Sequence, residues 1–317
     1  MRFIVTAIGS FSSNCVIRCL KAQGHYVVGC DIYEYSWLYE SHICDVFFQA
    51  PLALKENQYI DFLLTIAEKE RIDFIIPLTD VEIDVINKYR KVFLDNNIGL
   101  FIQTEECLSV VRNKYNLFSQ FNEDDNINVP KTILANNLQR VNGIIFPLVA
   151  KPINGRSSEG LYYISSEQDL KPILNSHKEY ILQEKIAGPI YTVDYIRDIH
   201  GNDYSIPREE LLRTKNGAGT TVRIVHDDIL ESSVSYIGGK LQIIGCVNME
   251  FIRRYDKYYL IDINPRFSAG LAFTVMTGYN MVISSINCFI GANILPPIKY
   301  KEQILIKRYV EDVLWTK

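Results

Sequence analysis

The sequence predicts an α/β lobe followed by two α+β lobes. Short apolar runs alternate with helical patterns over roughly the first hundred residues, which is typical of a parallel sheet. After about Asn128, strand-like segments dominate and several are joined by short polar turns, which favours antiparallel hairpins. The chain has 317 residues, and domains usually have roughly 100–200, so two or three lobes are expected.

The N-terminal lobe is predicted from the order of its elements. Gly9 forms the turn after the first apolar run, and Gly24 fits the position just beyond the first helix. Strands joined by helices run parallel, so the lobe is predicted to be doubly wound. The expected strands are 3–8, 26–31 and 73–77, and the expected helices are 15–23, 61–70 and 81–94.

The two following lobes are predicted from apolar segments of strand length. Their short polar connections indicate mostly antiparallel sheets. These segments lie at 147–151, 160–164, 180–185, 191–197, 219–224, 245–253 and 258–263. A mixed apolar and basic segment at 304–310 fits either packing onto a sheet or a homodimer contact.

Composition excludes several classes of protein. With 48% hydrophobic residues and mixed charge, the chain is not disordered, collagen-like or a coiled coil. A net charge of −4 argues against nucleic-acid binding, and no apolar run approaches the roughly 20 residues of a membrane helix. The apolar first nine residues suit a strand better than a signal peptide, so a cytoplasmic protein without a membrane partner is expected.

The seven cysteines are scattered and form no C-x-x-C pair. Cys15 and Cys19 are one helical turn apart, but no second Cys/His pair at zinc spacing accompanies them. We therefore expect reduced thiols in the core.

The N-terminus offers a weak hypothesis of dinucleotide binding. A strand, a glycine turn, a helix and then Asp31 at the end of the next strand fit the opening of such a domain. That motif needs three glycines, and only Gly9 is in place. The alternatives are a NAD site or a lobe of the same fold that binds something else or nothing.

Near the C-terminus two acidic strands form the strongest local signal. Glu250 and Asp262 are equidistant from Asp256, so a turn centred there sets them opposite each other, with Asn264 on the same face as Asp262. Opposed carboxylates repel unless a cation lies between them, and two carboxylates with an amide oxygen suit Mg²⁺. Pro265 then ends the strand, and Arg266 follows next to the expected phosphates. The alternative is an exposed hairpin whose acids face water.

The segment 262–266, Asp-Ile-Asn-Pro-Arg, closely resembles the E-I-N-P-R segment of the ATP-grasp superfamily. Segments resembling the family's nucleotide-binding stretch (112–132), lysine strand and phosphate loop (148–160), and adenine hinge with its following strand (181–194) come before it in the family's order. The likeness runs from about residue 108 to 290, and the first lobe resembles the domain preceding ATP-grasp in carbamoyl-phosphate-synthase-like enzymes and carboxylate–amine ligases. It implies a Rossmann-like pre-ATP-grasp domain (1–107), a small lid subdomain (108–187) and a large subdomain with the metal-binding hairpin (188–317).

The resemblance also implies residue roles. Arg266 would stabilise an acyl phosphate, and Lys151 would act both in catalysis and in nucleotide binding. Arg208 and Arg213 lie where such enzymes place cations that bind substrate or phosphate; the alternative is a solvated basic turn. ATP would be bound by Lys114, Lys151, the loop residues Gly155, Ser157 and Ser158, and the hinge residues Glu184, Lys185 and Ile186, and Mg²⁺ or Mn²⁺ by Glu250, Asp262 and Asn264.

Some positions depart from the family pattern. Ile190 stands where a glutamate usually contacts the ribose, and Asp262 is one methylene shorter than the usual glutamate. Ser157 replaces a loop glycine, and Glu159 stands where a basic residue is common.

The implied activity is ATP-dependent ligation of a small-molecule carboxylate, an amino acid or peptide, to an amine. The alternatives are a carbamoyl-phosphate-synthase-like enzyme that acts on bicarbonate or carbamate, and a nucleotide-binding regulatory protein without turnover. No Ser/His/Asp or Cys/His signature indicates a covalent route.

Overall fold

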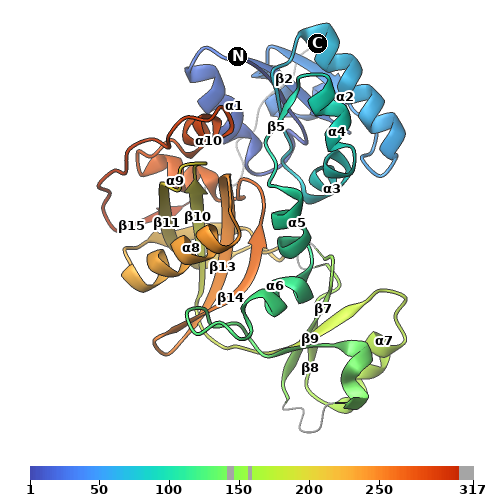
Figure 1. Cartoon of the computed structure of the whole chain (residues 1–317), viewed down its shortest axis with the longest axis vertical. Coiled ribbons are helices and arrows are strands. Elements are labelled where there is room, and N and C mark those ends of the chain that lie inside the picture. Colours follow the sequence, from blue (N-terminus) through green and yellow to red (C-terminus); the bar gives the residue numbers. More distant parts are fainter. Residues whose placement is uncertain (141–145, 156–158, 307–317) are drawn as a thin grey trace.

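The computed structural model describes residues 1–140, 146–155 and 159–306, and it shows three lobes, each built on one sheet (Figure 1). The predicted order of an α/β lobe followed by two α+β lobes is confirmed. The first sheet ends at Leu100, the second spans Thr132–Glu184 and the third begins at Ile190. The boundaries predicted at 107 and 187 lie in the segments between these sheets.

The N-terminal sheet is parallel, with the strand order β3-β2-β1-β4-β5. Helices cover it, as a doubly wound lobe requires (Figure 1). Its strands are β1 (Arg2–Val5), β2 (Tyr26–Asp31), β3 (Val46–Gln49), β4 (Phe74–Ile76) and β5 (Gly99–Leu100), and its helices are α1 (Ser13–Ala22), α2 (Glu56–Glu70), α3 (Asp80–Lys88) and α4 (Arg90–Asp95), with the short 3₁₀ turns η1 (Tyr35–Trp37) and η2 (Tyr39–His42).

Some details of this lobe differ from the prediction. The first strand ends at Val5 rather than at residue 8, because the chain turns at Ala7, where φ is 47°. The helix expected at 81–94 is two helices, α3 and α4, which meet at the non-helical residue Tyr89. The short strands β3 and β5 had no clear pattern in the sequence.

The glycine turn after β1 is closed by the protein itself. The Asp31 carboxylate accepts a hydrogen bond from the Gly9 amide at 2.8 Å and another from the Tyr33 amide at 3.1 Å. This contact uses the amide and the acid that a dinucleotide would need at this turn. The geometry therefore gives no support to the NAD hypothesis.

The middle lobe is small and antiparallel. Its sheet has the order β6-β9-β7-β8. The helices α5 (Glu105–Val111) and α6 (Lys114–Phe121), which the sequence patterns missed, lead into it from the first lobe (Figure 1). Its elements are β6 (Thr132–Leu134), η3 (Ala135–Arg140), β7 (Leu148–Pro152), β8 (Tyr162–Ile164), η4 (Glu167–Leu170), α7 (Lys171–Leu174) and β9 (Tyr180–Glu184).

The third lobe holds the largest sheet, in the order β14-β13-β10-β11-β12-β15. The sequence analysis missed β11, which contains Arg208 and Arg213, the residues considered there as a possible basic turn. β15 pairs with β12 and forms one edge of the sheet. Residues 307–310 of the segment considered for a homodimer contact lie outside the described residues. The elements are β10 (Ile190–Arg197), β11 (Asp203–Arg213), β12 (Gly219–Ile224), α8 (Asp228–Lys240), β13 (Gly245–Arg254), β14 (Lys257–Asn264), α9 (Leu271–Met276), α10 (Met281–Phe289) and β15 (Gln303–Ile306).

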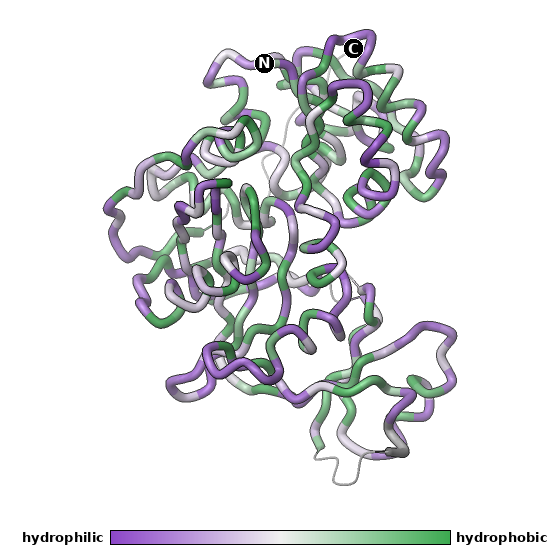
Figure 2. The backbone as a smooth tube through the Cα atoms, in the orientation of Figure 1, coloured by the Kyte–Doolittle hydropathy of each residue, from purple (hydrophilic) through white to green (hydrophobic). Residues whose placement is uncertain are grey.

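The buried side chains divide the molecule differently from the sheets. Two large cores each combine residues of the first and third lobes, so these two lobes pack as one body. The middle lobe has a separate core, which includes Leu148, Ile164, Leu170 and Leu182. Hydrophobic and hydrophilic stretches alternate along the chain in all three lobes (Figure 2). A lobe with its own core can move without breaking the cores beside it.

All seven cysteines are free thiols, five of them buried. No helix in the described part of the chain is long and apolar enough to cross a membrane.

Candidate functional site

A cavity of about 840 Å³ lies where the three lobes meet. The first lobe contributes the loops after β1 and β4 and the start of α3, with Gly9 and Asp80 among their residues. The middle lobe contributes β7 and β9, and the third lobe contributes β10, β11, β13 and β14. Ser157 and Ser158 lie outside the described residues, and every other residue predicted to bind or act lines this cavity: Lys114, Lys151, Gly155, Glu184, Lys185, Ile186, Glu250, Asp262, Asn264 and Arg266.

The acidic hairpin has the predicted pairing, and a bulge produces it. Glu250 pairs directly with Asp262, as predicted. The turn is centred between Tyr255 and Asp256, since Arg254 pairs with Lys257. That register alone would set Glu250 opposite Ile261. The register shifts by one residue between Glu250 and Phe251, which returns Asp262 to the position opposite Glu250 and to the same face.

Each of the opposed carboxylates already has a protein cation. Lys114 Nζ lies 3.0 Å from both carboxylate oxygens of Asp262. Arg213 Nη2 lies 3.1 Å from Glu250 Oε2. The sequence led us to expect a cation between the acids; in the structure two side chains from distant segments neutralise them.

Arg266 is held by the N-terminal lobe. Its Nε lies 3.2 Å from Asp80 Oδ1, and its Nη2 lies 3.3 Å from Asn264 Oδ1. Arg112 Nη1 is 3.7 Å from the same Asp80 oxygen. Burial raises the pKa of Asp80, but the Arg266 and Arg112 guanidinium groups outweigh it and hold that pKa below its usual value. Asp80, which the sequence analysis did not single out, thus orients the predicted catalytic arginine.

The two predicted phosphate lysines lie in different surroundings. Lys151, on β7, donates to the neutral amide oxygen of Gln183 at 2.9 Å. Burial and the charge of Lys114 lower the pKa of Lys151 to about 8, against the opposing effects of Asp262 and Glu250. Lys114 begins α6, and its backbone amide donates to the Ile153 carbonyl at 3.0 Å. This bond joins α6 to the turn that precedes the predicted phosphate loop.

The hinge between the middle and third lobes is fixed against β13. The Arg253 amide donates to the Pro189 carbonyl at 3.0 Å. A Cβ atom on Gly188 would lie 1.8 Å from the Arg253 carbonyl oxygen, so only glycine fits there. Glu184, at the start of the hinge, is paired with Arg254 at 3.1 Å.

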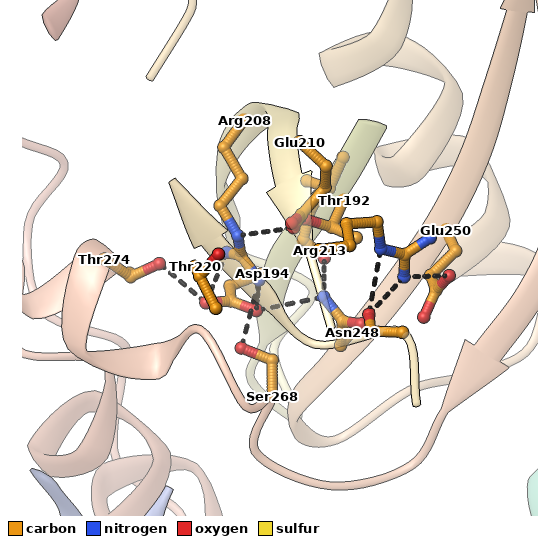
Figure 3. Close-up of polar contacts among 12 residues, drawn as sticks. Thr192, Asp194, Arg208, Glu210, Arg213, Thr220, Asn248, Glu250, Ser268 and Thr274 are labelled. Carbon is orange, nitrogen blue, oxygen red and sulfur yellow. Dashed lines mark hydrogen bonds and ion pairs between the residues drawn. The ribbon is translucent and has the colours of Figure 1, made fainter. Parts of the chain in front are cut away.

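Beside the cavity lies a buried polar cluster that the sequence analysis missed, apart from Arg208 (Figure 3); its members Arg208, Asn248 and Ser268 line the cavity. Asp194 accepts bonds from Arg208 Nη1 at 2.9 Å, Asn248 Nδ2 at 3.1 Å and Thr274 Oγ1 at 2.6 Å. Arg208 Nη2 also donates to Ser268 Oγ at 3.1 Å. The one signal for Asp194 in the sequence was an acid inside the apolar run 191–197. A buried acid of this kind needs partners.

The donor set of the hairpin suits a hard divalent cation. Two opposed carboxylates and an amide oxygen are the ligands that Mg²⁺ takes alongside phosphate oxygens. Glu250, Asp262 and Asn264 therefore fit Mg²⁺ or Mn²⁺ that arrives with a nucleotide.

Family models match two segments of the chain. Residues 176–311 match the model for ATP-grasp in the biosynthetic pathway with Ter operon. Residues 12–101 match the PylC-like N-terminal domain. The C-terminal part of the chain, residues 176–311, is therefore an ATP-grasp region. The resemblance described above is thereby confirmed.

Individual relatives are distant. The carbamoyl phosphate synthase large chain of Clostridium acetobutylicum is 23% identical over 260 residues, which are 75% of this chain and 24% of that protein. The chain thus spans about a quarter of the length of this curated relative.

Solved structures share the fold. The L-amino acid ligase of Bacillus licheniformis has a TM-score of 0.73 at 15% identity, covering 92% of this chain and 75% of that one. The biotin carboxylase domain of the Hydrogenobacter thermophilus 2-oxoglutarate carboxylase, solved with MgADP, ADP and bicarbonate, has a TM-score of 0.74 at 14% identity, covering 92% and 70%.

Proposed function

We propose that the chain is an ATP-dependent ligase that joins a carboxylate to an amine through an acyl phosphate. The observation that carries the proposal is the convergence of three parts in one cavity: the hinge at Glu184–Ile186, the lysines Lys114 and Lys151, and the opposed acids Glu250 and Asp262. The likeness to an L-amino acid ligase supports an amino acid or peptide as the carboxylate substrate.

In this proposal the nucleotide spans the cavity from the hinge to the hairpin. Glu184 and the Lys185–Ile186 backbone bind adenine, and Lys114, Lys151 and the loop that contains Gly155 bind the phosphates. Glu250, Asp262 and Asn264 hold Mg²⁺ or Mn²⁺, which neutralises phosphate charge when bound. The ADP complex of a structural relative supports this reading.

The proposed reaction has two steps. An oxygen of the substrate carboxylate attacks the γ-phosphorus, the bond to the β–γ bridging oxygen breaks, and ADP leaves. The amine nitrogen then attacks the acyl carbon, the bond to the phosphate oxygen breaks, and a proton leaves the nitrogen. Arg266 balances negative charge on the acyl phosphate, and Asp80 keeps its guanidinium in place. Positioning and electrostatics supply most of this catalysis.

Bicarbonate is the second candidate substrate. The bicarbonate in the Hydrogenobacter thermophilus complex and the match to a carbamoyl phosphate synthase favour it. Its oxygen would attack the γ-phosphorus in the same way, giving carboxyphosphate.

The test measures ADP release from Mg-ATP with pooled amino acids, other carboxylates or bicarbonate, each with and without an amine acceptor. Stimulation by one pool that disappears in Asp262→Asn would identify a ligase and its substrate class. ATP binding without stimulation by any pool would contradict a ligase and favour the regulatory alternative.

A further inference from the structure

The arginines of the cavity are not equally available to an anionic ligand. Arg208, Arg213 and Arg266 all line the cavity. Each is paired with a carboxylate, so only an arginine whose partner can be displaced can exchange that carboxylate for a carboxylate of the ligand.

Arg208 cannot be separated from its carboxylate partner, Asp194. Its side chain is 2% exposed, and the Asp194 side chain is 0% exposed. Separating this pair would leave an uncompensated charge in a place that water does not reach. Arg266 is fixed by Asp80, Asn264 and the Phe267 carbonyl, which it contacts at 3.2 Å.

Arg213 differs from both. It is the last residue of β11, where it pairs with Gly219 of β12 just after two register shifts around Leu212. Its carboxylate partner is Glu250, and it also donates to the Gly217 carbonyl. The Arg213 and Glu250 side chains are 19% and 20% exposed, so water can replace either partner.

Glu250 has two competing uses in the site. It neutralises Arg213 in the structure, and under the proposed function it ligates the divalent cation. Both uses draw on the same carboxylate, and two cations close together on it repel each other. Filling the metal site therefore weakens the hold of Glu250 on Arg213.

On the basis of the function proposed above, we infer that Glu250 keeps Arg213 occupied until a divalent cation binds, and that the released Arg213 then binds the anionic group of the acid substrate. A guanidinium suits a carboxylate or bicarbonate because it donates two parallel hydrogen bonds. This exchange of partners makes binding of the acid substrate depend on prior metal binding. It also prevents the acid substrate from binding to Arg213 while no nucleotide is present.

The first test is Mn²⁺ binding to the full chain without nucleotide, measured by electron paramagnetic resonance of the free ion. Arg213→Met removes the competitor and is expected to tighten Mn²⁺ binding about three- to tenfold. Arg223→Met is the matched control, because Arg223 pairs with Glu209 at 2.8 Å and lines no part of the cavity. It is expected to leave Mn²⁺ binding unchanged. An unchanged or weaker Mn²⁺ affinity in Arg213→Met would overturn the exchange.

The second test follows the arginine itself by phenylglyoxal labelling and peptide mass spectrometry. Saturating Mn²⁺ is expected to speed the modification of Arg213 several-fold, whereas Arg208, being buried, stays unlabelled. Glu250→Gln is expected to show the fast rate without metal and no response to Mn²⁺. Equal labelling of wild-type Arg213 with and without saturating Mn²⁺ would contradict release.

The third test adds the anion. With Mn²⁺ and a non-hydrolysable ATP analogue bound, acetate or bicarbonate should protect Arg213 from labelling, and chloride at equal ionic strength should not. Protection by one anion alone would show which candidate substrate Arg213 accepts. Protection by neither would refute its role as the acid receptor. Failure of the nucleotide analogue to bind would count against the proposed function, while the tests with Mn²⁺ alone still decide the exchange.

Discussion

Two arginine–carboxylate pairs lie near each other in the third lobe, and they differ in burial (Figure 3). The closest distances, 2.9 Å in Arg208–Asp194 and 3.1 Å in Arg213–Glu250, hardly distinguish them. Burial and further partners do. The Asp194 side chain is fully buried and also accepts hydrogen bonds from Asn248 and Thr274. The Glu250 side chain is a fifth exposed, and its ion-pair partner is Arg213. A short distance therefore does not show whether a pair is structural or exchangeable.

The backbone explains the difference. Arg208 lies in the regular part of β11, where it pairs with Thr192 of β10, and its side chain is buried. Arg213 follows the register shifts around Leu212, and such irregularities re-aim a side chain. One strand thus supplies a fixed arginine and a releasable one, five residues apart.

Among the tests of this comparison, Arg208→Met has the largest expected effect on stability. It leaves the Asp194 carboxylate buried with only neutral donors, so the free energy of unfolding is expected to fall by about 3–5 kcal/mol. Arg213→Met should cost about 1 kcal/mol or less, because water reaches its partner. Urea unfolding of both variants measures the contrast. Equal losses would mean that burial does not separate the two pairs.

Lys151 extends the comparison to a cation whose hydrogen-bond partner is neutral. With its pKa at about 8, Lys151 is mostly protonated at pH 7 and mostly neutral at pH 9. If its charge holds phosphate, affinity for a non-hydrolysable ATP analogue is greatest below pH 8. Calorimetry should show the dissociation constant rising about five- to tenfold from pH 7 to pH 9.

Two variants isolate this effect. Lys151→Met should bind the analogue about tenfold or more weakly at pH 7, with little further loss at pH 9. Lys151→Arg should remove the pH dependence, because arginine stays charged at both values. A wild-type slope that persists in Lys151→Met would assign the titration to another group.

The sequence patterns predicted the acids of this site better than the cations that pair with them. The acidic hairpin could be predicted because its pairing depends on residues close in sequence. Even there, the turn centre was wrong, and the bulge that corrected the register left no local signal. The counter-ions could not be predicted, because Lys114 is 148 residues from Asp262 and Asp80 is 186 residues from Arg266. Such pairs depend on how the lobes pack.

The second ion pair of the hairpin sharpens the comparison further. Lys114→Met should tighten the binding of Mn²⁺ alone about threefold, because it frees Asp262. The same variant should weaken the nucleotide analogue about tenfold, because a phosphate contact is lost. These opposite signs separate exchange from simple damage to the site, which would weaken both ligands. Parallel Mn²⁺ and analogue titrations on one preparation give both values.

A fourth ion pair, Arg254–Glu184 at the hinge, is the most exposed of those compared, at 42% and 36%, and should give the smallest effects. Arg254→Met is expected to change the free energy of unfolding by less than about 1 kcal/mol and to leave ATP binding intact, since it frees the carboxylate. Glu184→Ala should weaken ATP binding about fivefold, the value of one hydrogen bond of about 1 kcal/mol to the adenine amino group. Inosine triphosphate lacks that amino group, so its affinity should not change in Glu184→Ala. If both nucleotides lose affinity equally, Glu184 supports the shape of the hinge and does not recognise the base.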